Sequence, residues 1–298
     1  MDLILSSVSQ GLLWSIMAIG VYVTYRILDI ADLTAEGAYP LGAAVAATGI
    51  VGGMNPLLAT LLAFVAGMGA GLVSGLLHTK MKIPALLTGI VTLTGLYSIN
   101  LKILGKANVA LLRQETLVTQ LQGLGLSKTT AVLIIGSLFV AVVILLLTLL
   151  MNTQIGLALR STGDNIPMSE ANGINVNRMK IYGYMLSNGL IALSGALLTQ
   201  NNGFADLNSG TGTIVIGLAS VIIAEVILRN LRIGWRLLSV VLGSVIYRLI
   251  ILAILEIPGM DADLVKLFSA TLLAVVLFVP EIQKKLCVRK INVTDKTA

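Results

Sequence analysis

The segment Ile155–Lys180, IGLALRSTGDNIPMSEANGINVNRMK, separates two long apolar runs of this chain. One proline and three glycines accompany its charged residues, which are Arg160, Asp164, Glu170, Arg178 and Lys180. Charged side chains are costly inside hydrocarbon, and glycine and proline favour turns, so the segment cannot cross a membrane as a helix. The pattern predicts a polar connection, containing a short helix, between two membrane-spanning helices.

The composition of the whole chain points to a membrane protein. Of its 298 residues, 56% are hydrophobic and 11% charged, and the mean hydropathy is +0.95, whereas roughly a quarter of a soluble domain is charged. Apolar runs near the length needed to cross about 30 Å of hydrocarbon recur along the chain, unlike the short alternating segments of a β-barrel. We therefore expect an all-α, multi-pass membrane protein in which residues 1–298 form one transmembrane domain.

Cysteine and histidine are too scarce for a metal centre. His78 is the only histidine and Cys287 the only cysteine of the sequence, which excludes a disulfide framework and a multi-cysteine site. The sequence also lacks a phosphate-binding loop, because its nearest imitation, Gly123–Thr130 (GLGLSKTT), has the wrong spacing. We expect no bound metal or cofactor, no enzymatic activity and no nucleic-acid partner.

The apolar runs predict helices at residues 7–28, 38–53, 56–78, 84–104, 130–152, 179–201, 212–229, 235–256 and 263–281. Lysine and arginine gather in four stretches, which the positive-inside rule places in the cytoplasm: 78–82, 160–180, 229–236 and 284–290. The connections 52–55, 106–128, 201–212 and 256–263 are then expected outside, although the basic residues of 106–128 fit that side poorly. Residues 284–298 form a cytoplasmic tail.

The number of crossings stays open at eight or nine. Nine helices place the N-terminus outside, whereas eight, with a partial helix at 38–53, place both termini inside. Residues 25–37, YRILDIADLTAEG, mix charged and apolar residues, and the helix after them is short for a crossing. We favour the second option, eight crossings with a broken or re-entrant helix near residues 29–53, of the kind that forms binding sites in transporters. The alternative is a solvated loop in which Asp32 or Thr34 caps the next helix.

Two segments carry a family pattern. The first is the polar segment together with the apolar run Ile181–Leu198. It fits the pattern G-x-A-x-R-[AS]-x-G-x-N, followed by a small-residue pair, by G-I-x-V and by a final S-G-A-L. The second is Asp32–Ala47, DLTAEGAYPLGAAVAA, which fits D-[LI]-[ST]-x-x-G. The chain therefore resembles the permease subunits of bacterial ABC importers of the branched-chain amino acid and ribose type. Glu170–Ala171 departs from the pattern, where the pair often reads Ala-Ala, which leaves the contact details at this point open.

The resemblance implies partners and a place in the cell. It implies a separate ATPase subunit that hydrolyses ATP, an extracytoplasmic substrate-binding lipoprotein and a second permease copy in a homodimer. The expected location is the inner (plasma) membrane of a bacterial cell, in contact with membrane lipid.

By the same resemblance, residues 155–178 form a cytoplasmic coupling segment that sits in a cleft of the ATPase. Its small residues allow close approach, and its charged groups can make charge-assisted hydrogen bonds. The predicted coupling residues are Arg160, Ser161, Gly163, Asn165, Glu170, Ala171, Gly173 and Ile174. A plain connection between two spans is the alternative.

Polar groups predicted at membrane depth are candidates for the substrate pathway, because their insertion is costly. They are Asp29, Asp32, Thr34, Glu36, Asn100, Asn202 and Arg248. Arg248 lies about thirteen residues into its helix, roughly 20 Å along the axis, and we expect it or Arg26 to pair with one of the three acids. A structural ion pair that locks helices together is the alternative. Glu225 is expected to pair with Arg229 near a cytoplasmic end.

The substrate is expected to be a small polar solute, an amino acid. The stretch RILDIADLTAEGAYPLGAAV resembles the subgroup found with binding proteins for tryptophan and tyrosine, which favours an aromatic one. The competing hypothesis is an ion-coupled secondary transporter that uses Asp29, Asp32 and Glu36 for coupling. Of the two classes, only the ABC importer needs a docking segment for an ATPase.

Overall fold

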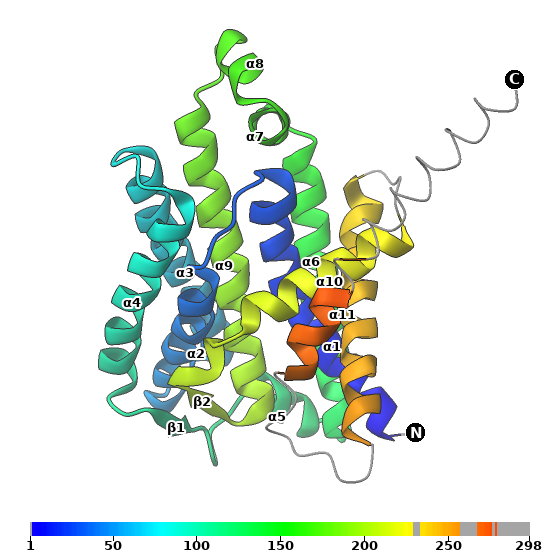
Figure 1. The fold of residues 1–298 in the computed structure, drawn as a ribbon. Helices are drawn as coiled ribbons and strands as arrows, with labels where there is room; N and C mark the ends of the chain where they lie inside the picture. Colours follow the sequence, from blue (N-terminus) through cyan, green and yellow to red (C-terminus); the bar gives the residue numbers. More distant parts are fainter. Residues whose placement is uncertain (1, 229–232, 257–266, 276–277, 279–298) are drawn as a thin grey trace, which may run out of the picture.

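A computed structural model describes residues 2–228, 233–256, 267–275 and 278 of the chain (Figure 1). It is a helical bundle, and seven helical stretches in its described part are long and apolar enough to cross a membrane: Leu3–Ile27, Pro56–Thr79, Ala85–Leu104, Lys128–Met151, Val176–Asn202, Leu207–Ile227 and Ile233–Leu255. The predicted all-α membrane class is therefore confirmed. The expected helix 263–281 is described only at residues 267–275 and 278, which are helical, and the tail 284–298 lies outside the described residues.

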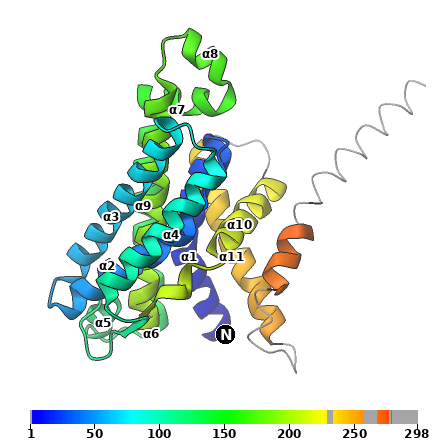
Figure 2. The same ribbon diagram turned by 60° about the vertical axis from the view of Figure 1, so that its left-hand side comes forward.

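The long helices run between two ends of the bundle, each marked by smaller elements. They are α1 (Asp2–Tyr22, continued by a π-helical turn, Val23–Ile27), α3 (Pro56–Thr79), α4 (Ala85–Leu104), α6 (Lys128–Met151), α9 (Val176–Asn202), α10 (Thr213–Ile227, after a 3₁₀ turn, Leu207–Gly210) and α11 (Ile233–Leu255). Short helices α7 (Gln154–Asp164) and α8 (Ile166–Ala171) stand at one end. The described start of α1 lies at the opposite end, with α5 (Leu117–Gln122) and strands β1 (Asn108–Ala110) and β2 (Phe204–Asp206) (Figures 1 and 2).

Helix α9 is the centre of the bundle and packs against α1, α2 and α3. In its most apolar window of 18 consecutive residues, 78% of the residues are buried, a larger share than in any other described span. Close packing depends on glycine: Gly67 and Gly71 of α3 lie directly against the main-chain carbonyls of Asn188 and Tyr184 in α9. A side chain at either glycine would collide with backbone, so α3 and α9 approach more closely than larger residues allow.

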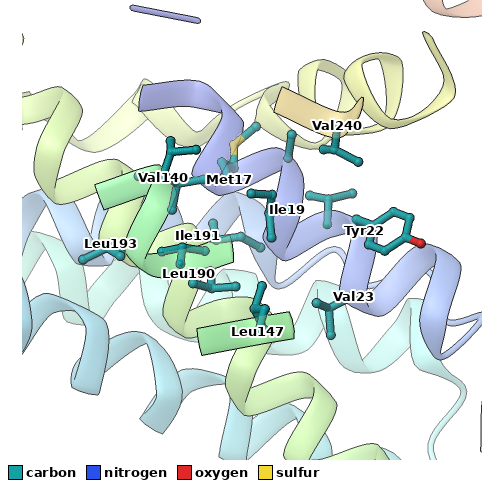
Figure 3. Close-up of a cluster of buried hydrophobic side chains, with 14 of the residues drawn as sticks. Met17, Ile19, Tyr22, Val23, Val140, Leu147, Leu190, Ile191, Leu193 and Val240 are labelled. Atoms are coloured by element: carbon teal, nitrogen blue, oxygen red, sulfur yellow. The ribbon is translucent and has the colours of Figure 1, made fainter. Parts of the chain in front are cut away.

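Apolar side chains fill the interior and also cover the outside. Figure 3 shows the largest buried cluster, in which Met17 and Ile19 of α1 meet Val140 of α6, Ile191 of α9 and Val240 of α11. Exposed leucine, isoleucine and valine side chains cover the outer faces of α3, α4 and α6. Because water penalises such a surface, these faces are suited to the hydrocarbon of a membrane.

Helix α2 (Ala35–Val51) begins inside the bundle, after a non-helical stretch that follows the π-helical turn. Between the π-helical turn and α2 the chain runs from the α7 end toward the middle of the bundle (Figure 1). Asp29 adopts a left-handed backbone conformation here, with φ 55°, which is uncommon for a residue other than glycine. At 17 residues, α2 falls outside the seven candidate spans, and it is buried along most of its length.

A two-stranded ribbon ties two connections together at the end opposite α7. Strand β1 (Asn108–Ala110) pairs antiparallel with β2 (Phe204–Asp206), with Val109 opposite Ala205. Two main-chain hydrogen bonds extend the pairing, from Leu111 N to the Gly203 carbonyl at 2.8 Å and from Leu207 N to the Ala107 carbonyl at 2.9 Å. The ribbon joins the chain after α4 to the chain after α9.

Candidate functional site

The polar segment forms two helices rather than one, separated by Asn165. This residue ends α7, and its Oδ1 accepts a hydrogen bond from Met168 N at 3.0 Å, which caps α8. Asn175 caps α9 in the same way, with Arg178 N at 3.1 Å. Asparagine is among the best N-caps, so these two residues determine where α8 and α9 begin. Figures 1 and 2 show α8 at the apex of the molecule.

Gly173 closes α8 with a left-handed residue, φ +79°, a conformation that glycine adopts without strain. Its N–H donates to the Glu170 carbonyl at 2.9 Å, and Ile174 N donates to the Ser169 carbonyl at 3.0 Å. Apart from its two chain neighbours, no described residue lies within 4 Å of the Cβ position of Gly173. The glycine is therefore required by the backbone itself.

The outer surface of α8 combines apolar side chains with one acid. Met168 is 64% exposed and Ile166 40% exposed, and Pro167, Glu170 and Ala171 are exposed beside them. The apolar side chains of such a tip can pack into an apolar pocket of a partner protein, while its carboxylate accepts hydrogen bonds from basic groups.

Three predicted coupling residues are partly buried instead. Gly163 lies against the main-chain carbonyl of Ile27, where a Cβ would overlap the oxygen. Arg160 donates from Nη2 to the Met151 carbonyl at 3.1 Å, and Ser161 donates to the Ala158 carbonyl at 3.0 Å. The predicted coupling residues thus divide between an exposed tip, around Glu170, Ala171 and Gly173, and an inner side of α7. Asn165 and the half-buried Ile174 hold the turns between them.

A buried polar network surrounds Asp32, which is 4% exposed. Its Oδ1 accepts from Thr34 N at 2.9 Å and its Oδ2 from Asn188 Nδ2 at 2.8 Å. The Thr34 hydroxyl lies 2.8 Å from the Ser74 hydroxyl, which donates to Thr92 Oγ1 at 3.0 Å. The sequence prediction missed Ser74 and Thr92, although a hydroxyl in the middle of a predicted apolar helix was an available signal. The network joins the start of α2 to α3, α4 and α9.

Two other predicted pathway residues, Glu36 and Asn100, line one pocket. Asn100 is fully buried, and its Nδ2 donates to the Gly37 carbonyl at 3.1 Å. Glu36 Oε1 accepts from Gly212 N at 3.0 Å. The pocket measures about 410 Å³ and lies between α2, α4 and the 3₁₀ turn. Asp29 is exposed and separate from this group.

The expected pairing of the arginines with these acids is wrong for Arg26. Its Nε lies 2.6 Å from Glu225 Oε1 of α10, because the end of α1 lies beside α10 in the bundle. Glu225 was expected to pair with Arg229, which lies outside the described residues.

Arg248 makes its described contacts with neutral groups rather than with the three acids. It donates to Gln10 Oε1 at 2.7 Å, and its guanidinium lies 5.5 Å from the Trp14 ring centroid. Trp14 in turn stacks on Tyr39, with ring centroids 5.5 Å apart. Asn202 is exposed and lines a second pocket of about 420 Å³ with Gln10 and Lys128. The predicted pathway residues therefore lie in several places rather than in one site.

Within the described part of the chain, no group of three histidine, cysteine or acidic side chains could hold a metal ion. The buried carboxylate of Asp32 is held by protein donors on both oxygens.

The sequence matches the family described as "Branched-chain amino acid transport system / permease component" over residues 3–277. The chain belongs to this permease family. As an ABC permease component it is a multi-pass membrane protein without an ATPase site of its own, and its family implies a separate ATPase subunit and a binding protein. The ATP-driven class therefore holds, and the ion-coupled class does not.

Relatives of this permease include transport proteins whose names state a substrate. It is 41% identical to a tyrosine transport system permease protein of Clostridioides difficile over 267 residues, covering 90% of this chain and 88% of the relative. It is 33% identical to an uncharacterised protein of Rickettsia prowazekii, covering 94% and 96% of the two chains. An autoinducer 2 import system permease protein of Yersinia enterocolitica is 27% identical, covering 93% of this permease and 74% of the relative. No solved structure matches.

Proposed function

We propose that this permease imports an aromatic amino acid, of which L-tyrosine is the best candidate, and that it works as a homodimer. The observation that carries the substrate is the 41% identity with a tyrosine transport permease over 90% of this chain. The binding protein delivers the amino acid on the outer side, and the permease pair encloses the path across the membrane.

In this proposal the tip of α8 enters a cleft of the ATPase, and α7 passes the movement to the bundle. The exposed Met168 and Glu170 support the first step, since they offer an apolar and a charged contact at the apex. The packing of Gly163 on Ile27 supports the second. The chain after Ile27 leads through the Asp32 network into α2, so a shift of α7 acts on the interrupted segment.

The proposed topology has nine crossings, with the N-terminus outside and residues 28–51 as a broken crossing. Support comes from the start of α1, which lies at the end opposite α7 (Figure 1). The positive-inside rule places α7 and α8 in the cytoplasm. In a Cys287→Ser background, Ser6→Cys should react with an impermeant thiol reagent in whole cells, and Asn172→Cys only after permeabilisation. Labelling of both in whole cells would contradict this topology.

Uptake tests the function directly. Proteoliposomes that contain the permease, its ATPase subunit and the binding protein should accumulate radiolabelled L-tyrosine when ATP is supplied. A hydrolysis-deficient ATPase subunit should abolish accumulation, and native mass spectrometry should find two permease copies. Accumulation that continues with this ATPase, or that unlabelled L-leucine inhibits as well as L-phenylalanine does, would contradict the proposal.

A further inference from the structure

The pocket between α2, α4 and the 3₁₀ turn is lined by two side chains that present hydrogen-bond acceptors and by an aromatic ring. Its volume of about 410 Å³ lies in the usual range for sites that hold small molecules. Its lining includes Glu36 of α2 and five residues of α4: Leu93, Thr94, Tyr97, Ser98 and Asn100.

Asn100 presents an acceptor for which the described residues provide no donor. Its Nδ2 donates to the Gly37 carbonyl at 3.1 Å, and because a carbonyl can only accept, this contact fixes which way the amide is turned. The buried Oδ1 has no hydrogen-bond partner among the described residues. A buried acceptor without a donor costs free energy, which a ligand that brings a donor recovers.

The charge of the pocket points to the same kind of ligand. Glu36 contributes a carboxylate, and its Oε1 already accepts one hydrogen bond, from Gly212 N. No lysine, arginine or histidine is among the described residues that line the pocket. A carboxylate and a free amide oxygen together select a positively charged donor, such as an ammonium group.

The remaining wall can accept a ring. Tyr97 is 50% exposed and lies one helical turn from Leu93 on α4, so the two side chains share one face of that helix. Aromatic rings in contact favour stacked or edge-to-face arrangements that add to the free energy of burial. The hydroxyl of Ser98 lies on the same helix and can donate to a carboxylate, whereas the Thr94 hydroxyl donates to the Ile90 carbonyl at 2.8 Å.

We propose that this pocket is a substrate site of the permease, in which an aromatic amino acid places its ammonium group toward Glu36 and Asn100 and its ring against Tyr97. The site rests on the proposed import of such an amino acid and adds residues that recognise it after its release from the binding protein. Each group of the ligand meets a matching group: the ammonium group meets the two acceptors, the aromatic ring meets Tyr97, and the carboxylate meets the Ser98 hydroxyl.

Uptake of L-tyrosine by substituted permeases tests the roles of the side chains. Tyr97→Ala should lower uptake at subsaturating L-tyrosine roughly two- to tenfold, and Tyr97→Phe should restore it, since the ring is the contact. Glu36→Gln keeps an acceptor for Gly212 N and should lower uptake about tenfold through the lost charge. Ile99→Ala is the matched control, because Ile99 is 51% exposed on α4 and does not line the pocket. Wild-type uptake by both Tyr97→Ala and Glu36→Gln would overturn the site.

Protection of an introduced cysteine from a thiol reagent tests binding to the pocket independently of transport. In the Cys287→Ser background, Ser98→Cys on the purified permease alone should react with a small maleimide, and L-tyrosine should slow this reaction. L-glutamate should not slow it, and Ile99→Cys should react at one rate with and without L-tyrosine. Protection in a permease that shows no ATP-dependent uptake would support the pocket and overturn the proposed function. ATP-dependent uptake without protection would overturn the pocket alone.

Discussion

Gly163 of α7 lies against the main-chain carbonyl of Ile27, at the last residue of the π-helical turn that ends α1. Gly183 of α9 lies against the side chain of the next residue, Leu28. The chain that leaves α1 therefore contacts a glycine at two consecutive residues before it turns toward α2. This contact lies between the predicted coupling segment and the interior.

Gly163→Ala should separate ATP hydrolysis from uptake. An added methyl group collides with the Ile27 carbonyl, and overpacking of this kind costs roughly 1–3 kcal/mol or displaces α7. We expect ATPase activity of the assembled complex to persist while L-tyrosine uptake per ATP falls. Gly69→Ala is the control, because no described residue of another element lies within 4 Å of its Cβ position on α3. Full uptake by Gly163→Ala would refute the role of this contact.

Gly173→Val should weaken ATPase association without preventing membrane insertion. A side chain at φ +79° strains the turn after α8 by roughly 1–2 kcal/mol, and Gly173→Asn should be milder because asparagine tolerates this conformation. Co-purification of the ATPase subunit measures the effect. Gly53→Val matches the strain, because Gly53 has φ +81° and the structure describes no residue beyond its chain neighbours within 4 Å of its Cβ position. It lies at the opposite end of the bundle, so this variant should retain the ATPase. Equal retention by both valine variants would show that the α8 turn is not the contact.

Glu170→Lys should reduce ATPase association through charge reversal at the exposed tip. A charge-assisted hydrogen bond contributes roughly 1.5–3 kcal/mol, so its loss weakens binding about tenfold or more. The dissociation constant of the purified ATPase from permease in nanodiscs checks this value. Glu115→Lys makes the same exchange at an exposed position near α5 and should not alter the constant. An unchanged constant for Glu170→Lys would remove this residue from the contact.

Asn188→Ala should destabilise the bundle, because it removes the amide donor from the buried carboxylate of Asp32. The lost hydrogen bond to a charged group costs roughly 1.5–3 kcal/mol, and thermal unfolding in detergent should show it as a lower Tm. Asn152→Ala, at an exposed position after α6, should leave Tm nearly unchanged.

A double-substitution cycle tests the origin of this effect. In an Asp32→Asn background, Asn188→Ala should cost less than in the wild type, because no charge is left without a donor. Equal costs in both backgrounds would show that Asn188 does not act through the Asp32 carboxylate.

The long apolar helices were predictable from the sequence, because membrane spans need length and hydropathy, both of which are local properties. The expected 130–152 corresponds to α6 at Lys128–Met151, and 84–104 to α4 at Ala85–Leu104. The interruption before α2 was also detectable, since acidic residues alternate with apolar ones there. The division of the polar segment into α7 and α8 was missed, although Asn165 followed by Pro167 is a helix-start signal.

Contacts between distant residues were beyond the sequence. Arg26 was expected to pair with an acid near it in the chain, yet its partner Glu225 lies on α10. Asp32 was singled out as a candidate for the substrate pathway, but its donor Asn188, which lies 156 residues away, was not foreseen. Such pairs depend on which helices are neighbours, and one sequence without its fold does not contain that information in readable form.

The β1–β2 ribbon has a consequence for changing what the permease accepts. Leu207, a pocket residue, follows β2 directly, and α4, the opposite wall, leads into β1. Main-chain hydrogen bonds thus set the spacing of the two walls, and exchanging side chains leaves those bonds in place. Redesign of selectivity can therefore be confined to the exposed positions of α4, with the ribbon as a fixed frame.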